Sequence, residues 1–415
     1  MKRLLLTLLC MLSLAPQAQV MVDSAWRDDV KTVQLYPTGA ELELPVLTIG
    51  NGRRLVLEFD VLRAEPEALR WRLLHCDRHW QADGLEANEF LTGFAEGTVD
   101  EYDFSFTTLK DYVHYRVVLP ESFASFTHSG NYIVAVEDDD GRKLLTRRFY
   151  VAEQSVAVRA EMTRPYDGMA IDRRQEVDVR LESKGWTMGD MQWLTVTVQQ
   201  NGRQDNVREL LFSGYDGNAL CYRQRPCNIF DGGNTYRYFD CSNLQTSMYN
   251  VQRVEEYGGE QFVLLRPEED RSRKHYLSET TLNGGMKVNI QNRNNPRLEA
   301  DYVWVNISLP IAQPLLEGSV YIVGELTNWR MDENSRMDYN PEYRAYTKRL
   351  LLKQGYYAYQ LLVNGGKWNA ANGRSATAPL EGDHYETPNR YMVYVYQHSP
   401  SDRADRLLAV QQVIP

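Results

Sequence analysis

The chain has 415 residues, of which 43% are hydrophobic and 25% are charged, and its formal net charge at pH 7 is −10. A single β-sandwich holds about 100 residues, so a chain of this length predicts several domains. Phosphate backbones are bound through dense patches of Lys and Arg, so an acidic excess argues against a nucleic-acid-binding protein.

The first residues predict export. Lys2 and Arg3 precede an apolar run at 4–14, and small or polar residues follow it. This order is typical of a secretory signal peptide. The run is also shorter than the roughly 20 residues that a membrane-spanning helix needs. We predict a signal peptide at residues 1–18, cleaved after Ala18, and an exported chain that does not span the membrane.

Alternation of apolar and polar residues predicts β-strands along almost the whole chain. It is clearest at residues 55–61, 69–73, 177–181, 303–309 and 357–363. Such a period of two is typical of antiparallel strands with one buried face. Asp140-Gly141 and Asn364-Gly365 are pairs that favour tight hairpin turns. Short strands separated by turn residues predict an all-β fold of tandem immunoglobulin-like or early-set β-sandwich domains.

Breaks in the pattern predict the domain boundaries. The first domain is expected at residues 22–153 and the second at 154–310. A proline-flanked break at 310–314 leads to a third domain at 315–398, and the tail at 399–415 is expected to be loose.

Four cysteines remain after the signal peptide is removed: Cys76, Cys221, Cys227 and Cys241. In an oxidising compartment, three of them close together predict a disulfide. Cys221 and Cys227 are the favoured pair because Pro226 lies between them in a short loop, and Cys221–Cys241 is the alternative. The Cys-x2-Cys spacing common in zinc sites is missing, so no metal is predicted.

Motifs that carry catalytic chemistry are missing. The segment His75-Cys76-Asp77-Arg78-His79 follows a predicted strand, which favours a strand-to-loop corner with a buried Cys76. Asp138-Asp139-Asp140 lacks the later oxygen ligands of a calcium-binding loop, so a hairpin turn explains it. Neither Gly-x-Ser-x-Gly nor His-Glu-x-x-His occurs. We therefore predict no enzymatic activity and no cofactor.

The third predicted domain resembles early-set immunoglobulin-like modules that bind glycogen and starch. The resemblance rests on residues 320–329, 350–360 and 363–368. In those modules two tryptophans stack on sugar rings, and Trp329 and Trp368 hold the matching places. Asn364-Gly365 replaces the usual Asp-Gly turn. A periplasmic or surface glycan-binding protein is therefore the alternative function.

A second resemblance covers most of the exported chain. Its motifs are Trp71–Trp80, Leu91–Phe94, Tyr112–Pro120, Ser129–Val134, Arg147–Val151, Phe230–Asp240, Tyr276 with Leu282-Asn283-Gly284, and Glu299–Val303. In order and spacing they are similar to the plug proteins of the type IX secretion system of Bacteroidota. The resemblance implies a periplasmic protein, associated with the outer membrane, that binds the giant β-barrel translocon of that system. Such a protein closes the periplasmic opening of the barrel by shape, without catalysis.

The aromatic and acidic stretch at residues 80–106 is the predicted contact region with the translocon. Its candidate contact residues are Trp80, Phe90, Phe94, Tyr102 and Phe104. Aromatic side chains often anchor protein interfaces, which is the reason for choosing them.

Overall fold

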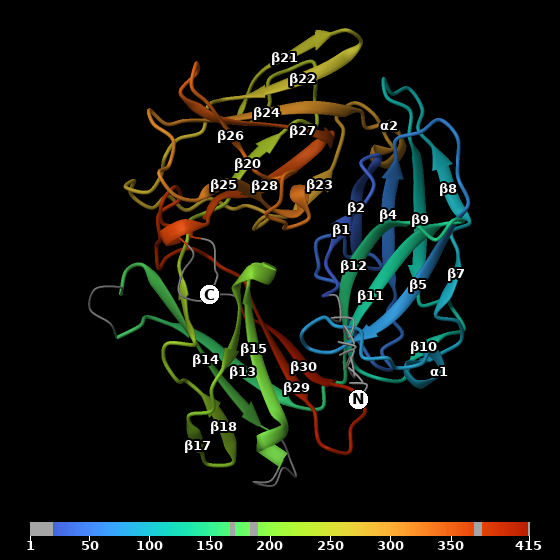
Figure 1. Ribbon diagram of the computed structural model, residues 1–415, viewed down its shortest axis with the longest axis vertical. Helices are drawn as coiled ribbons and strands as arrows, with labels where there is room; N and C mark the ends of the chain where they lie inside the picture. The colour runs from blue at the N-terminus through green and yellow to red at the C-terminus, as the bar shows by residue number, and fades with distance from the viewer. Residues whose placement is uncertain (1–19, 167–170, 183–189, 369–375, 414–415) are drawn as a thin grey trace, which may run out of the picture.

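The structure is a computed structural model that describes residues 20–166, 171–182, 190–368 and 376–413. These residues form three β-sandwiches that meet near the middle of the molecule (Figure 1). We name them the N-terminal sandwich (24–152), the split sandwich (157–231 with 391–413) and the inserted sandwich (237–364). The predicted all-β fold of tandem sandwiches is confirmed.

The N-terminal sandwich packs two sheets over one apolar core. One sheet has the order β1-β12-β11-β5-β7, with β3 parallel to β12, and the other has the order β2-β4-β9-β8. The strands are β1 (Ser24–Ala25), β2 (Val30–Pro37), β3 (Val46–Thr48), β4 (Leu55–Val61), β5 (Leu69–Cys76), β7 (Glu96–Thr98), β8 (Glu101–Phe104), β9 (Val113–Leu119), β11 (Gly130–Asp138) and β12 (Lys143–Ala152). A short ladder of β6 (Leu91–Thr92) with β10 (Ser125–Phe126) follows the single turn of α1 (Ala87–Phe90).

The split sandwich is built from two distant parts of the chain. One sheet has the order β13-β14-β18-β17, with β19 beside β14, and the other has the order β16-β15-β29-β30. The strands are β13 (Ala157–Thr163), β14 (Arg174–Glu182), β15 (Leu194–Gln200), β16 (Val207–Leu210), β17 (Gly214–Asp216), β18 (Ala219–Tyr222), β19 (Ile229–Asp231), β29 (Tyr391–Gln397) and β30 (Arg406–Val413). Two 3-10 turns, Asp190–Trp193 and Gln204–Asn206, flank β15.

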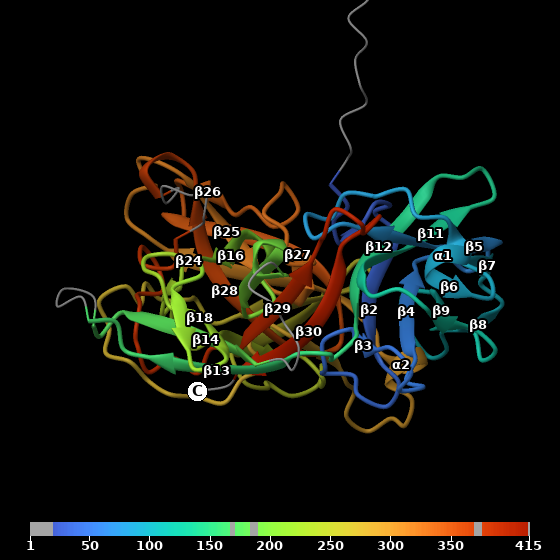
Figure 2. The same cartoon turned by 90° about the horizontal axis from the view of Figure 1, so that it is seen from below.

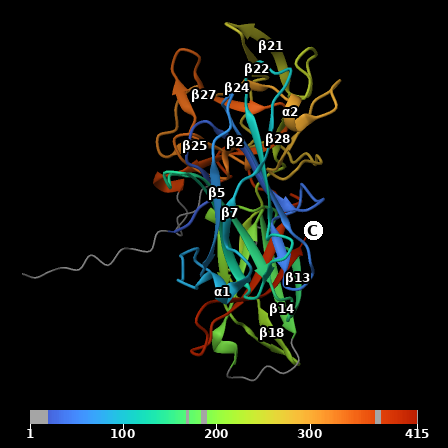
Figure 3. The same ribbon diagram turned by 90° about the vertical axis from the view of Figure 1, so that its right-hand side faces the viewer.

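The inserted sandwich lies in the chain between β19 and β29. One sheet has the order β20-β28-β23, with β25 beside β28, and the other has the order β21-β22-β24-β27-β26. The strands are β20 (Arg237–Asp240), β21 (Val251–Tyr257), β22 (Glu260–Leu265), β23 (Met286–Val288), β24 (Tyr302–Pro310), β25 (Ser319–Val323), β26 (Asp338–Asn340), β27 (Ala345–Lys353) and β28 (Gly355–Asn364). Helix α2 (Pro296–Glu299) and the 3-10 turns Glu325–Thr327 and Gly366–Trp368 complete it. Figure 3, viewed from the side of the N-terminal sandwich, shows the inserted sandwich above and the split sandwich below.

This division differs from the predicted boundaries at 154–310 and 315–398. Strands β24 and β25 flank the predicted break at 310–314, yet both contribute to one core. β29 pairs with β15 of the split sandwich, from Leu194 opposite Gln397 to Gln200 opposite Tyr391. The tail expected to be loose forms β30. The physical reason is that alternation shows which side chains of a strand are buried, but not which strand it pairs with.

Local predictions from alternation and turn residues fare better. The five alternating stretches all lie in strands β4, β5, β14, β24 and β28. Asp140-Gly141 forms the predicted hairpin turn between β11 and β12, where Gly141 has a φ of +75°. Asn364-Gly365 does not close a tight hairpin, because the 3-10 turn Gly366–Trp368 follows β28. In the described part of the chain, no helix has the length and apolar character to cross a membrane.

Strand β5 confirms the predicted corner with a buried Cys76. Leu73 packs in the core of the N-terminal sandwich, whereas Cys76 packs on the opposite side, in the cluster shared with the split sandwich. Nδ1 of His75 lies 2.5 Å from the carboxylate of Asp83, and both Cys76 and His75 are buried.

Candidate partner-binding surface

The outer edge of the N-terminal sandwich carries exposed aromatic side chains. Phe94 and Phe123 are 66% and 65% exposed, and their ring centroids lie 6.1 Å apart in an edge-to-face arrangement. Tyr102 and Phe104 of β8 are 43% and 52% exposed, with centroids 5.9 Å apart. We call these two separate pairs, one in the loops before β7 and β10 and the other in β8, the aromatic edge. The strands β7 and β8 lie on the side of the N-terminal sandwich that faces away from the other two sandwiches (Figures 1 and 2).

Strand β8 positions half of the aromatic edge. It is the last strand of its sheet, and all four of its residues are exposed. Its register with β9 places Tyr102 opposite the core residue Tyr115, and their ring centroids lie 5.9 Å apart. Glu101 and Asp103 alternate with the aromatic residues, and Glu101 forms an ion pair of 2.9 Å with Arg116. The edge therefore combines apolar rings with an acidic border.

Phe123 belongs to the aromatic edge but was not predicted from the sequence. It comes from the segment before β10, about 30 residues after Phe94. The two rings meet because Gly93 allows a close approach: a Cβ at Gly93 would lie 2.7 Å from Cβ of Ala124. A glycine in a turn was the only sequence signal of this contact, and it does not identify the partner segment.

Two of the five predicted contact residues are buried and therefore not available to a partner. Trp80 is 7% exposed and Phe90 is 2% exposed. Phe90 packs in the core of the N-terminal sandwich. Trp80 packs between the N-terminal and split sandwiches, with the guanidinium of Arg148 over its ring at 4.4 Å and the ring of Tyr150 at 5.2 Å. Phe94, Tyr102 and Phe104 are the predicted residues that the structure leaves exposed.

The two tryptophans of the alternative glycan-binding function lie in different surroundings. Trp329 is half-buried, packs edge-to-face on Tyr236 at 6.4 Å, and lines a cavity between the sandwiches. Trp368 is also half-buried and packs against the core of the inserted sandwich. A shared exposed platform for a sugar ring, as the resemblance implied, is therefore not what these two side chains offer.

A buried polar cluster joins the N-terminal sandwich to the inserted sandwich. The amine of Lys353 lies 2.6 Å from Oδ2 of Asp60, and both side chains are 1% exposed. The hydroxyl of Tyr302 donates to the same oxygen at 2.6 Å, and Nδ1 of His114 lies 2.7 Å from Oδ1. Burial alone would raise the pKa of the Asp60 carboxyl, but the charge of Lys353 and the hydrogen bond from His114 outweigh it and lower that pKa. The carboxylate is thus held charged between two sandwiches.

Aromatic stacking and ion pairs join the N-terminal sandwich to the split sandwich. Tyr150 of β12 stacks on Tyr394 of β29 with centroids 4.5 Å apart. Arg78 pairs with the buried Asp405 at 3.1 Å. A further ion pair of 2.8 Å joins Glu153 to Arg406 of β30. Contacts of this kind, extending over apolar surface, favour a fixed arrangement of the sandwiches over independent motion.

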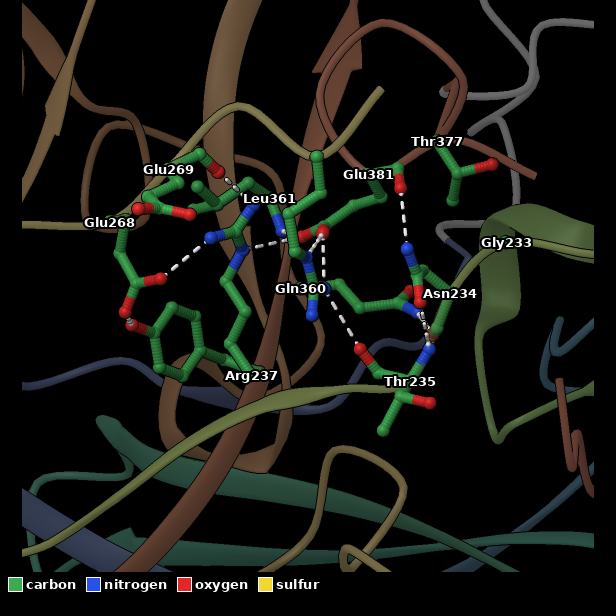
Figure 4. A network of polar contacts seen from close by, with 12 residues as sticks. Gly233, Asn234, Thr235, Arg237, Glu268, Glu269, Gln360, Leu361, Thr377 and Glu381 are labelled. Carbon is green, nitrogen blue, oxygen red and sulfur yellow. Dashed lines mark hydrogen bonds and ion pairs between the residues drawn. The ribbon is translucent and has the colours of Figure 1, made fainter. Parts of the chain in front are cut away.

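The motif Phe230–Asp240 forms the crossing from the split to the inserted sandwich, and its Arg237 belongs to a buried network of polar contacts (Figure 4). Arg237 donates to Glu381 at 2.9 Å, to Glu268 at 2.6 Å and to the carbonyl of Glu269 at 2.8 Å. Burial alone would raise the pKa of the Glu381 carboxyl, but the charges of Arg237 and Arg271 outweigh it and lower that pKa to about 2. The backbone N–H of Leu361 also donates to Glu381 at 2.8 Å. These groups are engaged with one another, which is the property of a structural network.

The predicted disulfide between Cys221 and Cys227 is not formed. Cys76, Cys221, Cys227 and Cys241 are all free thiols. Cys221 is buried in β18, between its ladders with β14 and β17. Cys227 lies in the following turn, where its thiol donates to the carbonyl of Gln224 at 2.7 Å. In the described part of the chain, no group of three or more His, Cys, Asp and Glu side chains is arranged to hold a metal ion.

Comparison with known proteins identifies the N-terminal sandwich. Residues 30–153 match the family model for the type 9 secretion system plug protein 1st domain. No curated protein matches the chain. The crystal structure of a hypothetical protein from Parabacteroides merdae ATCC 43184 superposes with a TM-score of 0.90 over 95% of this chain and 99% of that chain, at 29% identity. A biofilm associated protein, BSP domain, aligns over 95% of this chain and 67% of that chain at 8% identity, but its TM-score of 0.15 supports no argument.

The superposition extends over all three sandwiches, so their mutual arrangement recurs in the Parabacteroides merdae protein. The family match falls on the sandwich that carries the aromatic edge. The resemblance inferred from the sequence motifs is confirmed for the N-terminal sandwich, whose residues 30–153 match the type 9 secretion system plug protein 1st domain.

Proposed function

We propose that this chain is a periplasmic plug subunit of the type IX secretion system. It binds the large outer-membrane β-barrel translocon and closes the periplasmic opening of the barrel by steric fit, without catalysis. The signal peptide at residues 1–18 delivers it to the periplasm, where it stays associated with the outer membrane. The observation that carries this proposal is the match of residues 30–153 to the first domain of plug proteins.

The buried junctions support a steric mechanism. A plug that closes an opening by its shape must hold that shape against the partner. The Asp60–Lys353 pair and the Tyr150–Tyr394 stack tie the N-terminal sandwich to both of the others. These contacts give the three sandwiches the rigidity that such a role requires.

The aromatic edge is our proposed contact surface with the translocon. Stable interfaces bury at least roughly 1,000 Å² and are anchored by a few aromatic or Arg side chains. Phe94, Tyr102, Phe104 and Phe123 are exposed and paired, and aromatic side chains have only two χ angles, so little conformational entropy is lost when a partner covers them. The acidic border, with Glu101 and Asp103, selects a partner surface with basic or hydrogen-bond-donating groups.

The first test is co-purification of the tagged chain from gently solubilised envelopes of its native host. The expected result is recovery of a very large outer-membrane barrel with the wild-type chain. The double variant Phe94→Ala/Phe123→Ala should recover less than about a tenth as much, because the loss of two interface anchors weakens binding by more than about 1.4 kcal/mol. The matched control is Tyr343→Ala, which removes a 69% exposed aromatic ring from the inserted sandwich.

The second test is the permeability of the outer membrane. A strain that lacks the chain should admit a large hydrophilic antibiotic faster than wild type, and the Phe94→Ala/Phe123→Ala chain should not restore the barrier. Co-purification of no large barrel, together with retention of the chain on glucan resin, would contradict the plug function and favour glycan binding. Recovery of the barrel at the wild-type level with the double variant would refute the aromatic edge as the contact surface, but it would leave the plug function itself standing.

A further inference from the structure

A cavity of about 300 Å³ lies where the three sandwiches meet. The N-terminal sandwich contributes residues 41–45 and β12, the split sandwich contributes the end of β15, and the inserted sandwich contributes residues 281–285 and the turn at 325–329. The volume is at the lower end of the range of small-molecule sites. Two motifs of the sequence analysis lie beside this cavity, namely Leu282-Asn283-Gly284 and the segment ending at Trp329. Neither belongs to the aromatic edge.

Three arginines, Arg147, Arg148 and Arg390, line the cavity together with four acids, Asp23, Glu41, Glu43 and Glu325, and none of these arginines forms an ion pair among the described residues. Arg147 is 7% exposed and donates to the carbonyls of Thr146 and Val33 and to the side chain of Asn328, all uncharged groups. Arg390 is half-buried; its backbone N–H donates to Asn201, but within the described residues its guanidinium has neither an ion pair nor a hydrogen bond. Burial lowers the pKa of both guanidinium groups.

The acids around the cavity accept hydrogen bonds or form ion pairs with groups other than the guanidiniums of Arg147 and Arg390. The carboxylate of Glu325 acts on both arginines, but its burial raises its pKa, and one of its oxygens accepts from the N–H of Met286 at 2.9 Å. Asp23 accepts from the backbone N–H of Arg148. Glu41 and Glu43 are exposed and pair with Arg297 and Arg53. Asp23 and Glu325 offset part of the charge of Arg147, and Glu325 offsets part of that of Arg390, but neither acid forms an ion pair with them, so both guanidinium groups keep N–H donors for a ligand.

A second unsatisfied group lines the same cavity. Gln199 is 2% exposed; its oxygen accepts from the hydroxyl of Tyr394 at 2.8 Å, but its amide nitrogen has no partner among the described residues. Buried donors are normally paired, so this nitrogen marks a place for an acceptor. Apolar side chains line the rest of the cavity, namely Leu42, Leu282 and the ring of Trp329.

We propose that this cavity binds a ligand that carries a carboxylate on an apolar or aromatic body. The carboxylate lies between Arg390 and Arg147 and accepts from Gln199, and the body packs on Leu282 and Trp329. A guanidinium donates two parallel, charge-assisted hydrogen bonds to a carboxylate. An arginine therefore binds a planar anion more strongly than an uncharged group. The ligand is either a free organic acid or the C-terminal carboxylate of a peptide, and binding there is independent of the closure of a channel.

Calorimetric titration of the purified full chain tests the proposal with four probes. They are N-acetyl-phenylalanine, its neutral amide, a pentapeptide that ends in phenylalanine with a free carboxylate, and the same pentapeptide amidated. At least one acid should bind at least about tenfold more tightly than its amide, because hydrogen bonds to charged groups are the stronger ones. Binding of the free acid alone identifies a small acid as the ligand, and binding of the peptide alone identifies a chain terminus. Binding of neither acid, or equal binding of acid and amide, would overturn the proposal.

Variants separate binding from folding. Arg390→Gln should weaken binding of the preferred acid by about tenfold or more. Its melting temperature should stay close to that of wild type, because the guanidinium of Arg390 forms neither a hydrogen bond nor an ion pair with the described residues that the substitution would remove. Arg336→Gln is the matched control, since Arg336 is half-buried and pairs with Glu333 away from the cavity, and it should leave binding unchanged. A lower melting temperature for Arg390→Gln would make Arg390 a structural residue and would count against the site.

Discussion

Replacing Asp60 with Asn is expected to weaken the junction between the N-terminal and inserted sandwiches more than any exposed substitution does. The Asp60 carboxylate is 1% exposed and accepts contacts from Lys353, Tyr302 and His114 within 2.7 Å. Asparagine keeps the shape but removes the charge and one acceptor oxygen. The amine of Lys353, itself 1% exposed, is then left without its counter-charge.

The size of the effect follows from these contacts. Removal of one partner from a buried ion pair costs about 3–5 kcal/mol. Each hydrogen bond to a charged group contributes about 1.5–3 kcal/mol. The three contacts share one carboxylate and are therefore not additive, so a total loss of about 3–5 kcal/mol is consistent with them. With an m value of about 3 kcal/mol/M in urea, the midpoint of unfolding should fall by roughly 1–1.7 M.

Urea unfolding of the full chain measures this, with hydrogen exchange at β4 and β24 as a readout of the junction itself. Lys353→Met and the double variant Asp60→Asn/Lys353→Met complete a double-mutant cycle, and the double variant should lose less than the sum of the single ones by about 1–3 kcal/mol. Glu255→Gln is the control, because it breaks an exposed pair with Arg253 and should change stability by less than about 0.5 kcal/mol. A loss below about 1 kcal/mol for Asp60→Asn, or a cycle without coupling, would refute the argument that this cluster holds the two sandwiches together.

Other predictions concern single sites. The carboxyl of Glu381 has its pKa lowered from 4.5 to about 2, so its contribution is fully present above pH 4.5 and is lost as the pH falls through 2. Stability measured at pH 5 should exceed that at pH 2 by roughly 3 kcal/mol more in wild type than in Glu381→Gln, and equal acid dependence in both would contradict this. Gly284→Ala should destabilise the chain more than Gly258→Ala. A Cβ at Gly284 would lie 2.3 Å from the ring of Trp329, whereas Gly258 has a similar positive φ and open space around it. The melting temperatures of the two variants should differ by several degrees, and equal melting temperatures would exclude the clash. Alkylation of the unfolded, unreduced chain should label all four cysteines of the exported protein. Alkylation of the folded chain should label the half-exposed Cys227 first. Two cysteines that stay unlabelled after unfolding would show that a disulfide is present.

The sequence predicted those features that depend on neighbouring residues. Strands β4 and β24 were found because one face of each is apolar, and the turn at Gly141 was found because glycine tolerates a positive φ. The pairing of β15 with β29 was not predictable in this way, since it joins segments almost 200 residues apart. The insertion of one sandwich into another follows from that pairing and was missed with it.

The candidate contact residues show the same limit. Trp80 and Phe94 both follow strands in aromatic, acidic loops, and nothing local distinguishes them. Trp80 is buried because the split sandwich covers it, through a cluster that includes Tyr394 and Leu407. Phe94 is exposed because no such neighbour covers the outer edge of the N-terminal sandwich. The difference is set by residues about 300 positions later in the chain, so the local pattern of residues could not have separated the two.

Several of the motifs quoted from the sequence lie where sandwiches meet. Tyr302 reaches Asp60 across one junction, the segment that contains Arg237 crosses another, and Gly284 packs on Trp329 at the central cavity. A side chain on an open strand face can change freely, but a side chain that fits two sandwiches at once must match both. The arrangement of the three sandwiches is therefore the property that these motifs encode. A steric plug depends on that arrangement, whereas a glycan-binding module would need only one sandwich and its surface.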